Sequence, residues 1–210
     1  MKVLLRAPLL SRSGYGVHSR QVFRYLLQNP NLEIKTQIVP WGVTPWCVDH
    51  QAENGLIGEA LSRSINSTDE NFDVSVQVQL PNEWDPKLAK YNIGMTAGVE
   101  TDRCSDAWIG SINQMDKVIV PTEFAKNTFL NSGKVTTDVD VVAECFDEEM
   151  AECNKPLQVD FDTSFNFLIF HKSKKNIANY FKSFNKSACN CSIITYSFSN
   201  RIGNSSKAIY

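Results

Sequence analysis

The sequence has no acidic side chain after Asp162, although it is 210 residues long. Residues 1–170 carry 23 acidic and 14 basic side chains, whereas residues 171–210 carry seven lysine and arginine residues and no carboxylate. This absence excludes a catalytic aspartate or glutamate from residues 171–210. The formal net charge of -2 therefore combines an acidic region with a basic one, and the change near residue 170 indicates a boundary between them.

Long apolar runs are also missing, since none approaches the roughly 20 residues that a membrane-spanning helix needs. Residues 1–10 do not match a signal peptide, because Arg6 interrupts them and no small-residue cleavage site follows. The six cysteines form no C-x-x-C pair and no cluster with zinc-type spacing, so no metal site is predicted. Without an export signal, a cytoplasmic protein with reduced thiols is expected.

What the sequence does contain is an alternation of short apolar runs and helical patterns. Strands are expected at residues 3–10, 33–41, 72–80, 92–100, 117–121, 139–143 and 165–170. Helices are expected at residues 17–28, 51–65, 105–115 and 123–131. Strands separated by helices of this length predict βαβ units, and hence an α/β fold with a Rossmann-like, doubly wound parallel sheet.

The capping residues fit this pattern, with Ser105 and Thr122 as expected N-caps and Gly133 as an expected C′ residue. Residues 1–146 are enough for a complete Rossmann-like domain. Residues 147–164 are expected to form a linker. Residues 165–210 are then an incomplete second domain, because so short a segment cannot build an independent core.

The loop at residues 11–19, SRSGYGVHS, joins the first strand to the first helix and is the first candidate site. Glycine lets a backbone approach a phosphate or sugar closely, and a helix N-terminus favours negative charge. As a dinucleotide fingerprint the loop is incomplete, because Gly14 and Gly16 are followed by Ser19 in place of a third glycine. A tight strand-to-helix turn explains the glycines equally well.

A second candidate is the polar turn Glu100-Thr101-Asp102, which follows a strand of small residues. Polar groups at the carboxyl end of a central strand face the ligand crevice of an α/β sheet. Glu100 and Asp102 are therefore a candidate carboxylate pair for catalysis. The structural alternative is that Asp102 helps Ser105 to cap the next helix.

Thr122 and Glu123 form the third candidate, at the end of the strand 117–121. Their structural role is an N-cap followed by an acidic first turn, and a ligand role for either is secondary. His18 and His171 have no serine or cysteine partner at a recognisable spacing, so no catalytic triad is predicted.

The chain resembles the N-terminal half of GT-B glycosyltransferases, two-domain enzymes that transfer sugars from nucleotide donors. One matching segment is KVLLRAPLLSRSGYGVHSRQVFRYL near the N-terminus, and the stronger one is residues 92–133, NIGMTAGVETDRCSDAWIGSINQMDKVIVPTEFAKNTFLNSG. Within it, residues 116–124, DKVIVPTEF, fit the family pattern D-x-V-x-V-P-[ST]-x-F. The similarity covers about residues 1–170.

The resemblance implies an acceptor-side first domain, a nucleotide-sugar donor bound mainly by the second domain, and no other cofactor. Gly14, Tyr15 and Gly16 would lie near the donor diphosphate or the acceptor. The polar turn at residues 100–102 would lie beside the reacting sugar. The residues assigned on this basis are Glu100 and Asp102 as catalytic, and Gly14, Tyr15, Gly16, His18, Thr101, Thr122 and Glu123 as substrate-binding.

The family's catalytic glutamate pair belongs to its second domain, and residues 171–210 contain no acid that could supply it. Of these residues, 31 are Lys, Asn, Ser, Ile, Tyr or Phe, a bias that suggests a truncated or frame-shifted gene. We therefore expect a glycosyltransferase fragment whose catalytic half is largely missing, and which is inactive or weakly active unless a partner chain completes the site.

Two other classes of function remain open. The basic residues 171–210, with interleaved aromatic side chains, could make a non-enzymatic module that binds nucleic acid or an acidic partner, although no nucleic-acid-binding motif is present. A Rossmann enzyme that uses NAD or a methyl donor is the third reading. It is the weakest, because the strand 33–41 ends without an acid to hold a ribose.

Overall fold

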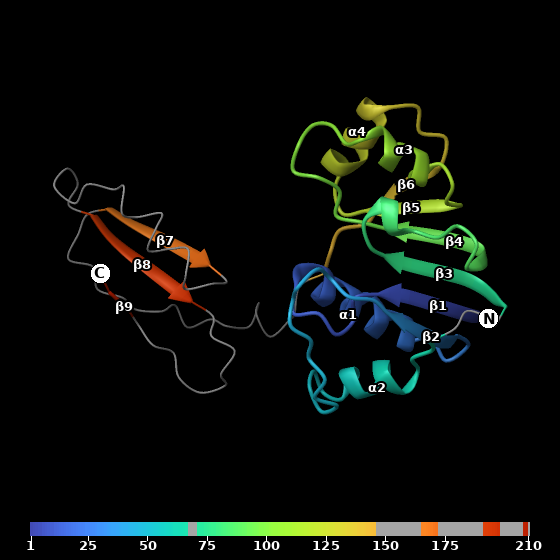
Figure 1. The fold of residues 1–210 in the computed structure, drawn as a ribbon, viewed down its shortest axis with the longest axis horizontal. Helices are drawn as coiled ribbons and strands as arrows, with labels where there is room; N and C mark the ends of the chain where they lie inside the picture. Colours follow the sequence, from blue (N-terminus) through green and yellow to red (C-terminus); the bar gives the residue numbers. More distant parts are fainter. Residues whose placement is uncertain (67–70, 146–164, 172–190, 198–207, 210) are drawn as a thin grey trace. The chain divides into compact units, whose positions relative to one another are not determined.

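The computed structural model describes residues 1–66, 71–145, 165–171, 191–197 and 208–209 (Figure 1). The chain separates into two compact units, residues 1–147 and 148–210. The first unit contains a six-stranded sheet with its helices, and the second contains a separate three-stranded sheet. All described helices belong to the first unit.

The sheet of the first unit is entirely parallel and has the strand order β2-β1-β3-β4-β5-β6. Its strands are β1 (Lys2–Ala7), β2 (Glu33–Ile38), β3 (Phe72–Val78), β4 (Ala89–Met95), β5 (Lys117–Val120) and β6 (Asp138–Val141). The connecting helices are α1 (Gly14–Leu27), α2 (Leu56–Ser62), the short 3₁₀ helix η1 (Pro81–Glu83), α3 (Asp106–Ile112) and α4 (Glu123–Ser132). The predicted α/β class, with a parallel sheet flanked by helices, is confirmed.

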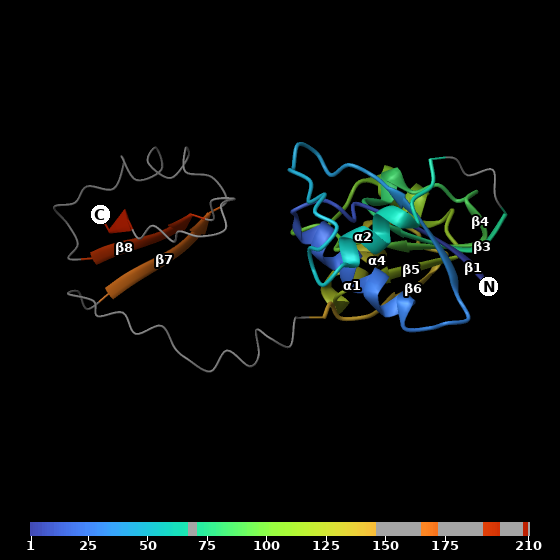
Figure 2. The same ribbon diagram turned by 90° about the horizontal axis from the view of Figure 1, so that it is seen from below.

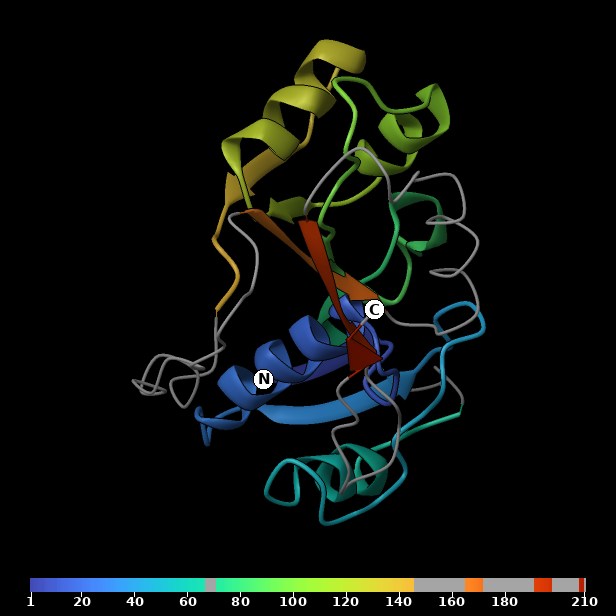
Figure 3. The same cartoon turned by 90° about the vertical axis from the view of Figure 1, so that its left-hand side faces the viewer.

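Two hydrophobic clusters cover the two faces of this sheet. On one face, Phe23 of α1 and Ala60 of α2 pack with side chains of β1, β2 and β3. On the other face, Ile112 of α3 and Phe129 of α4 pack with side chains of β5 and β6. The helices α1 and α3 accordingly lie on opposite sides of the sheet in Figure 3. The helix α2 lies below β2 in Figure 1 and therefore in front in Figure 2, which is seen from below.

Beyond β2, a single parallel bridge between Thr36 and Ser64 extends the sheet by one residue pair. The Thr36 amide donates to the Arg63 carbonyl at 3.0 Å, and the Ile65 amide donates to the Thr36 carbonyl at 2.9 Å. With this bridge counted as a very short strand, the order matches the 3-2-1-4-5-6 arrangement of dinucleotide-binding sheets, with one strand added. From β1 the chain first adds strands on the β2 side of the sheet, and it then crosses over to add β3 and the later strands on the other side of β1. Sheets with such a switch point between two neighbouring strands bind their ligands there, at the carboxyl ends of the strands.

The connection between β3 and β4 is short for parallel neighbours, because only residues 79–88 join them. Two buried amide side chains, Gln77 and Asn92, bond to the backbone of this connection. Gln77 Nε2 donates to the Asp85 carbonyl at 2.7 Å, and the Asp85 amide donates back to Gln77 Oε1 at 2.8 Å. Asn92 Nδ2 donates to the Pro86 carbonyl at 2.8 Å. These amides therefore fix the path of the connection.

The second unit contains β7 (Phe165–His171), β8 (Cys191–Ser197) and β9 (Ala208–Ile209). β7 and β8 pair in parallel, with Phe165 opposite Cys191 and His171 opposite Ser197. β8 and β9 pair in the antiparallel sense. The predicted strand at 165–170 is confirmed, whereas the predicted linker at 147–164 lies outside the described residues.

Several predicted element boundaries are wrong by a few residues. The first helix begins at Gly14 and not at residue 17, because Ser13 already caps it. The predicted helix at 51–65 is limited to α2, since Glu53, Asn54 and Gly55 have positive φ angles that a right-handed helix excludes.

The prediction of Gly133 as a C′ residue is off by one position, because Gly133 is the C-cap residue of α4. This residue follows α4 in an extended conformation, with φ -179° and ψ -174°. A side chain at Gly133 would press against Ile109, whose Cγ2 atom would lie 3.2 Å from the added Cβ. The glycine therefore serves helix packing and not a left-handed cap.

Candidate functional site

A cavity of about 150 Å³ lies at the carboxyl edge of the parallel sheet, where α1 begins. It is lined by Gly14, Tyr15 and His18 of α1, by Ala97 after β4, and by Glu144 after β6. Three segments that are far apart in the sequence thus meet at the edge where α/β proteins bind their ligands. Among the predicted site residues, the structure brings Gly14, Tyr15 and His18 together in this cavity.

The start of α1 is held by a chain of hydroxyl groups. The Ser13 side chain accepts a hydrogen bond from the Gly16 amide at 3.1 Å and so caps the helix. Ser11 Oγ lies 2.9 Å from Ser13 Oγ and 2.6 Å from Thr44 Oγ1. The loop before α1 is therefore tied to the loop between β2 and α2.

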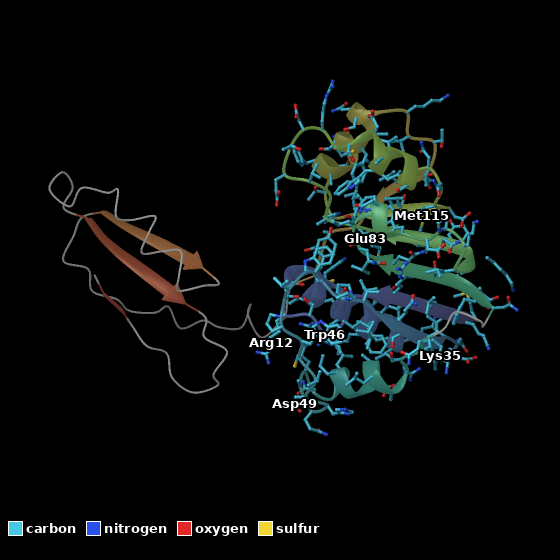
Figure 4. All side chains as sticks on the ribbon, viewed as in Figure 1. Arg12, Lys35, Trp46, Asp49, Glu83 and Met115 are labelled. Carbon is cyan, nitrogen blue, oxygen red and sulfur yellow. The ribbon has the colours of Figure 1, made fainter. Side chains whose placement is uncertain are left out.

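That second loop returns to the start of α1 through backbone contacts as well. Ser11 forms an isolated bridge with Trp46, and the Arg12 amide donates to the Pro45 carbonyl at 3.1 Å. Arg12 and Trp46 accordingly lie near one another at this edge of the first unit (Figure 4). These contacts hold the loop whose Trp41 stacks on Tyr15, a lining residue of the cavity.

The two glycines of the loop have different roles. A side chain at Gly16 would overlap the Ser11 carbonyl oxygen, which also accepts a hydrogen bond from Arg20 Nη1 at 2.9 Å. Gly16 is buried and does not line the cavity, so its small size is required by the chain itself. At Gly14, by contrast, no heavy atom lies within 4 Å of the position of an added Cβ. Only Gly14 therefore opens toward a ligand.

Tyr15 connects the cavity to both of its neighbouring loops. Its ring stacks on Trp41, with a centroid distance of 4.0 Å and an interplanar angle of 19°. Its hydroxyl oxygen accepts a hydrogen bond from the Ala97 amide at 3.0 Å and lies 2.9 Å from Thr96 Oγ1. Burial raises the pKa of the Tyr15 phenol above its ordinary value of 10.0, so the ring is neutral at physiological pH.

His18 and Glu144 supply the ionisable groups of the cavity. His18 Nδ1 lies 3.9 Å from Glu144 Oε1, and this buried nitrogen has no hydrogen-bond partner among the described residues. The segment that carries Glu144 is held against α1, because Gln21 Nε2 donates to the Cys145 carbonyl at 3.0 Å. The pair can accept or donate a proton to a group that lies between them.

The predicted catalytic residues Glu100 and Asp102 are exposed in the loop after β4, and neither lines the cavity. Thr101, between them, is also exposed and bonds locally, with its hydroxyl donating to the Arg103 carbonyl at 2.7 Å. Ser105 is the N-cap of α3, so Asp102 is not the capping residue. A catalytic role for Glu100 and Asp102 stays a prediction.

Thr122 and Glu123 occupy the start of α4. Thr122 Oγ1 accepts from the Ala125 amide at 3.1 Å, which is an ordinary N-cap, and Glu123 lies in the first helical turn. Both residues are exposed and lie outside the cavity lining. Their structural role accounts for the sequence pattern around them.

Four residues that complete the site were not predicted: Trp41, Thr96, Ala97 and Glu144. Trp41 carried a usable signal, because a tryptophan at the carboxyl end of a predicted strand faces the ligand edge of the sheet. Glu144 carried none, since its approach to His18 depends on the path of the chain after β6.

Within the part of the chain that the structure describes, no three or more His, Cys, Asp or Glu side chains are arranged to hold a metal ion. In the same part, the longest helix, α1, has 14 residues, and no helix is long and apolar enough to cross a membrane. The aromatic residues proposed to contact nucleic acid lie almost entirely outside the described residues.

Comparison of the chain with known protein families, with curated proteins and with solved structures finds no match. The resemblance to GT-B glycosyltransferases therefore rests on the sequence segments alone.

Proposed function

We propose that this protein acts in sugar transfer, and that its first unit is the acceptor-side domain of a GT-B glycosyltransferase. The observation that carries the proposal is the cavity between α1, the loop after β4 and the segment after β6, which joins an aromatic stack to a histidine–carboxylate pair. It lies at the carboxyl edge of a parallel sheet with a Rossmann-type strand order. The segments that resemble the family, residues 2–26 and 92–133, include α1 and the loop after β4, which are two of the three segments that line it.

The size and lining of the cavity support a sugar ring as the bound group. A cavity of about 150 Å³ accommodates one six-membered ring. Ligand sites for small organic molecules combine apolar walls with a few polar groups that fix orientation. Tyr15 and Ala97 supply such walls, and His18 and Glu144 supply the polar groups.

Transfer of a sugar to an acceptor hydroxyl needs a group that removes the hydroxyl proton and groups that stabilise the departing diphosphate. The proposal assigns the contact with the acceptor hydroxyl to His18 and Glu144, which both line the cavity and lie 3.9 Å apart. No lysine or arginine lines the cavity, so the proposal assigns the diphosphate to groups elsewhere in the chain or in a partner chain.

The proposal is tested with the full 210-residue chain and a panel of methyl glycosides (glucoside, galactoside and mannoside). Saturation-transfer NMR should detect binding of at least one of them, and His50→Phe should bind as the wild type does, because His50 is exposed and outside the cavity. Radiolabelled nucleotide sugars added with the bound glycoside then report transfer. If no glycoside binds, or if NAD protects the chain in a thermal-shift assay, the proposal is wrong.

A further inference from the structure

The His18 ring and the Glu144 carboxylate face one another at a distance that is too long for a direct hydrogen bond but short enough for one atom to bridge them. His18 Nδ1 and Glu144 Oε1 lie 3.9 Å apart across the cavity wall, whereas N–H···O bonds measure about 2.9 Å. An oxygen placed about 2.8 Å from each of the two atoms completes a triangle over this gap. Buried polar atoms normally have a hydrogen-bond partner, and His18 Nδ1 has none among the described residues.

We propose that His18 and Glu144 together bind one hydroxyl group of a neutral, ring-shaped ligand, an inference that rests on the proposed sugar-binding function. A hydroxyl group has one proton to donate and two lone pairs to accept with. It donates its proton to the Glu144 carboxylate and accepts a hydrogen bond from the Nδ1–H tautomer of His18. A bridging hydroxyl thereby satisfies the histidine nitrogen that the protein leaves unpaired.

The charge of the cavity selects against the diphosphate, which the sequence left as the other ligand of this loop. Apart from His18, Glu144 is the only acidic or basic side chain in the cavity lining. The nearest buried cation of α1, Arg20, is already bonded to the Leu9 and Ser11 carbonyls at 3.0 and 2.9 Å. An anion in the cavity would face the Glu144 carboxylate without a compensating lysine or arginine.

The one remaining polar side-chain group of the cavity lining, the Tyr15 hydroxyl, is already engaged, which leaves His18 and Glu144 as the side chains that can bond to the ligand. The Tyr15 hydroxyl interacts with Thr96 and with the Ala97 amide. The Tyr15 ring is held by its stack on Trp41 and can only offer an apolar surface. A sugar ring has an apolar face, which fits the Tyr15 ring, and a rim of hydroxyl groups, which fits His18 and Glu144.

The test is an NMR titration of the full chain with ¹⁵N-labelled histidine. The chain has three histidines, so the His18 ring signals are assigned from the spectrum of His18→Phe. Methyl glucoside, methyl galactoside and methyl mannoside are one set of probes, and uridine diphosphate is the other. Glu144→Leu and His18→Phe should each weaken glycoside binding about tenfold, the effect of one lost hydrogen bond.

Glu144→Gln separates hydrogen bonding from charge, because the amide keeps the shape of the carboxylate and one acceptor oxygen but carries no charge. It should retain glycoside binding within about threefold and bind uridine diphosphate more tightly than the wild type does. The matched control Glu33→Gln changes a carboxylate at the opposite end of the sheet and should alter neither affinity.

The outcomes separate this inference from the proposed function. If the wild type binds a glycoside but His18→Phe and Glu144→Leu bind it equally well, the hydroxyl-binding role is wrong and the proposed function stands. If uridine diphosphate shifts the His18 signal in the wild type, the assignment of a neutral ligand is wrong. If no glycoside binds to any variant, the proposed function itself fails.

Discussion

The helices α1 and α4 begin in the same way, but only α1 borders the cavity at the carboxyl edge of the sheet. Ser13 and Thr122 each accept a hydrogen bond from the amide three residues later, both at 3.1 Å. Around the start of α1, the loop after β2, the loop after β4 and the segment after β6 come together. Around the start of α4, Thr122 and Glu123 are exposed. The helix cap alone therefore does not form a site. The cavity at α1 forms because segments that are distant in the sequence meet there.

The largest effect on the free energy of unfolding is expected when the two glycines of the α1 loop are replaced by alanine, one at a time. Gly16→Ala should destabilise the first unit by about 3 kcal/mol, because the added methyl group overlaps the Ser11 carbonyl. Gly14→Ala has open space and should stabilise the helix by about 0.5 kcal/mol while narrowing the cavity. Urea denaturation measures both values. Equal destabilisation by the two substitutions would contradict the assignment of Gly16 to packing and of Gly14 to the open side of the cavity.

Removal of the Tyr15 hydroxyl should have the next largest effect. Tyr15→Phe keeps the stack on Trp41 but leaves the Ala97 amide and Thr96 hydroxyl without this partner, which should cost about 2 kcal/mol. The matched control is Tyr25→Phe, whose ring is exposed and whose change should be near zero.

The stability difference between the wild type and Tyr15→Phe should also depend on pH. Because the folded-state pKa of Tyr15 is raised above 10.0, its contribution is fully present below that pH and is lost as the pH rises through the folded pKa. The stability difference between the wild type and Tyr15→Phe should therefore shrink in alkaline solution. A difference that stays constant well above pH 10.0 would contradict the burial of this phenol.

The two capping residues provide the most direct comparison of the helix starts. Ser13→Ala and Thr122→Ala should each cost about 1 kcal/mol, since each removes one capping hydrogen bond. Only Ser13→Ala should also weaken glycoside binding, because the α1 start lines the cavity. Thermal unfolding and glycoside titration of both variants check this. Weaker glycoside binding by Thr122→Ala would place the ligand at α4.

The smallest effect is expected at the edge of the sheet, where Lys117 contacts Asp138 at 2.6 Å and Asp140 at 2.7 Å. Hydrogen bonding to Lys117 lowers the pKa of Asp138 below 3.8, so this carboxylate stabilises the fold above that pH and ceases to do so as the pH falls through its folded pKa. Asp138→Asn should change acid stability slightly and glycoside binding not at all. Weaker glycoside binding by Asp138→Asn would show that the cavity and this edge of the sheet are coupled.

The elements of the fold could be predicted from the sequence because their signals are local. Alternating apolar residues marked β3, and Thr122 marked the start of α4, as the structure confirms. The boundaries of α2 were missed because three successive residues with positive φ precede it, and their conformation depends on tertiary contacts.

The candidate site could be predicted only where it lies next to a local motif. Gly14, Tyr15 and His18 belong to the glycine loop and were predicted together. Glu144 reaches His18 across 126 positions of the chain, and Trp41 reaches Tyr15 through the return of the loop after β2. Such contacts have no periodicity or spacing in one sequence, so these two pairings could not be predicted from it, although the position of Trp41 at the end of a predicted strand does indicate the ligand edge of the sheet.

The most direct test of the central claim is to map glycoside binding by backbone amide NMR on the full chain. The account predicts that the titrating signals belong to Gly14, His18 and Ala97, which line the cavity at the start of α1. The signals of Thr122 and Glu123 at the start of α4 should not move. Shifts confined to Thr122, Glu123 or the Glu100–Asp102 turn, with the cavity residues unchanged, would contradict it.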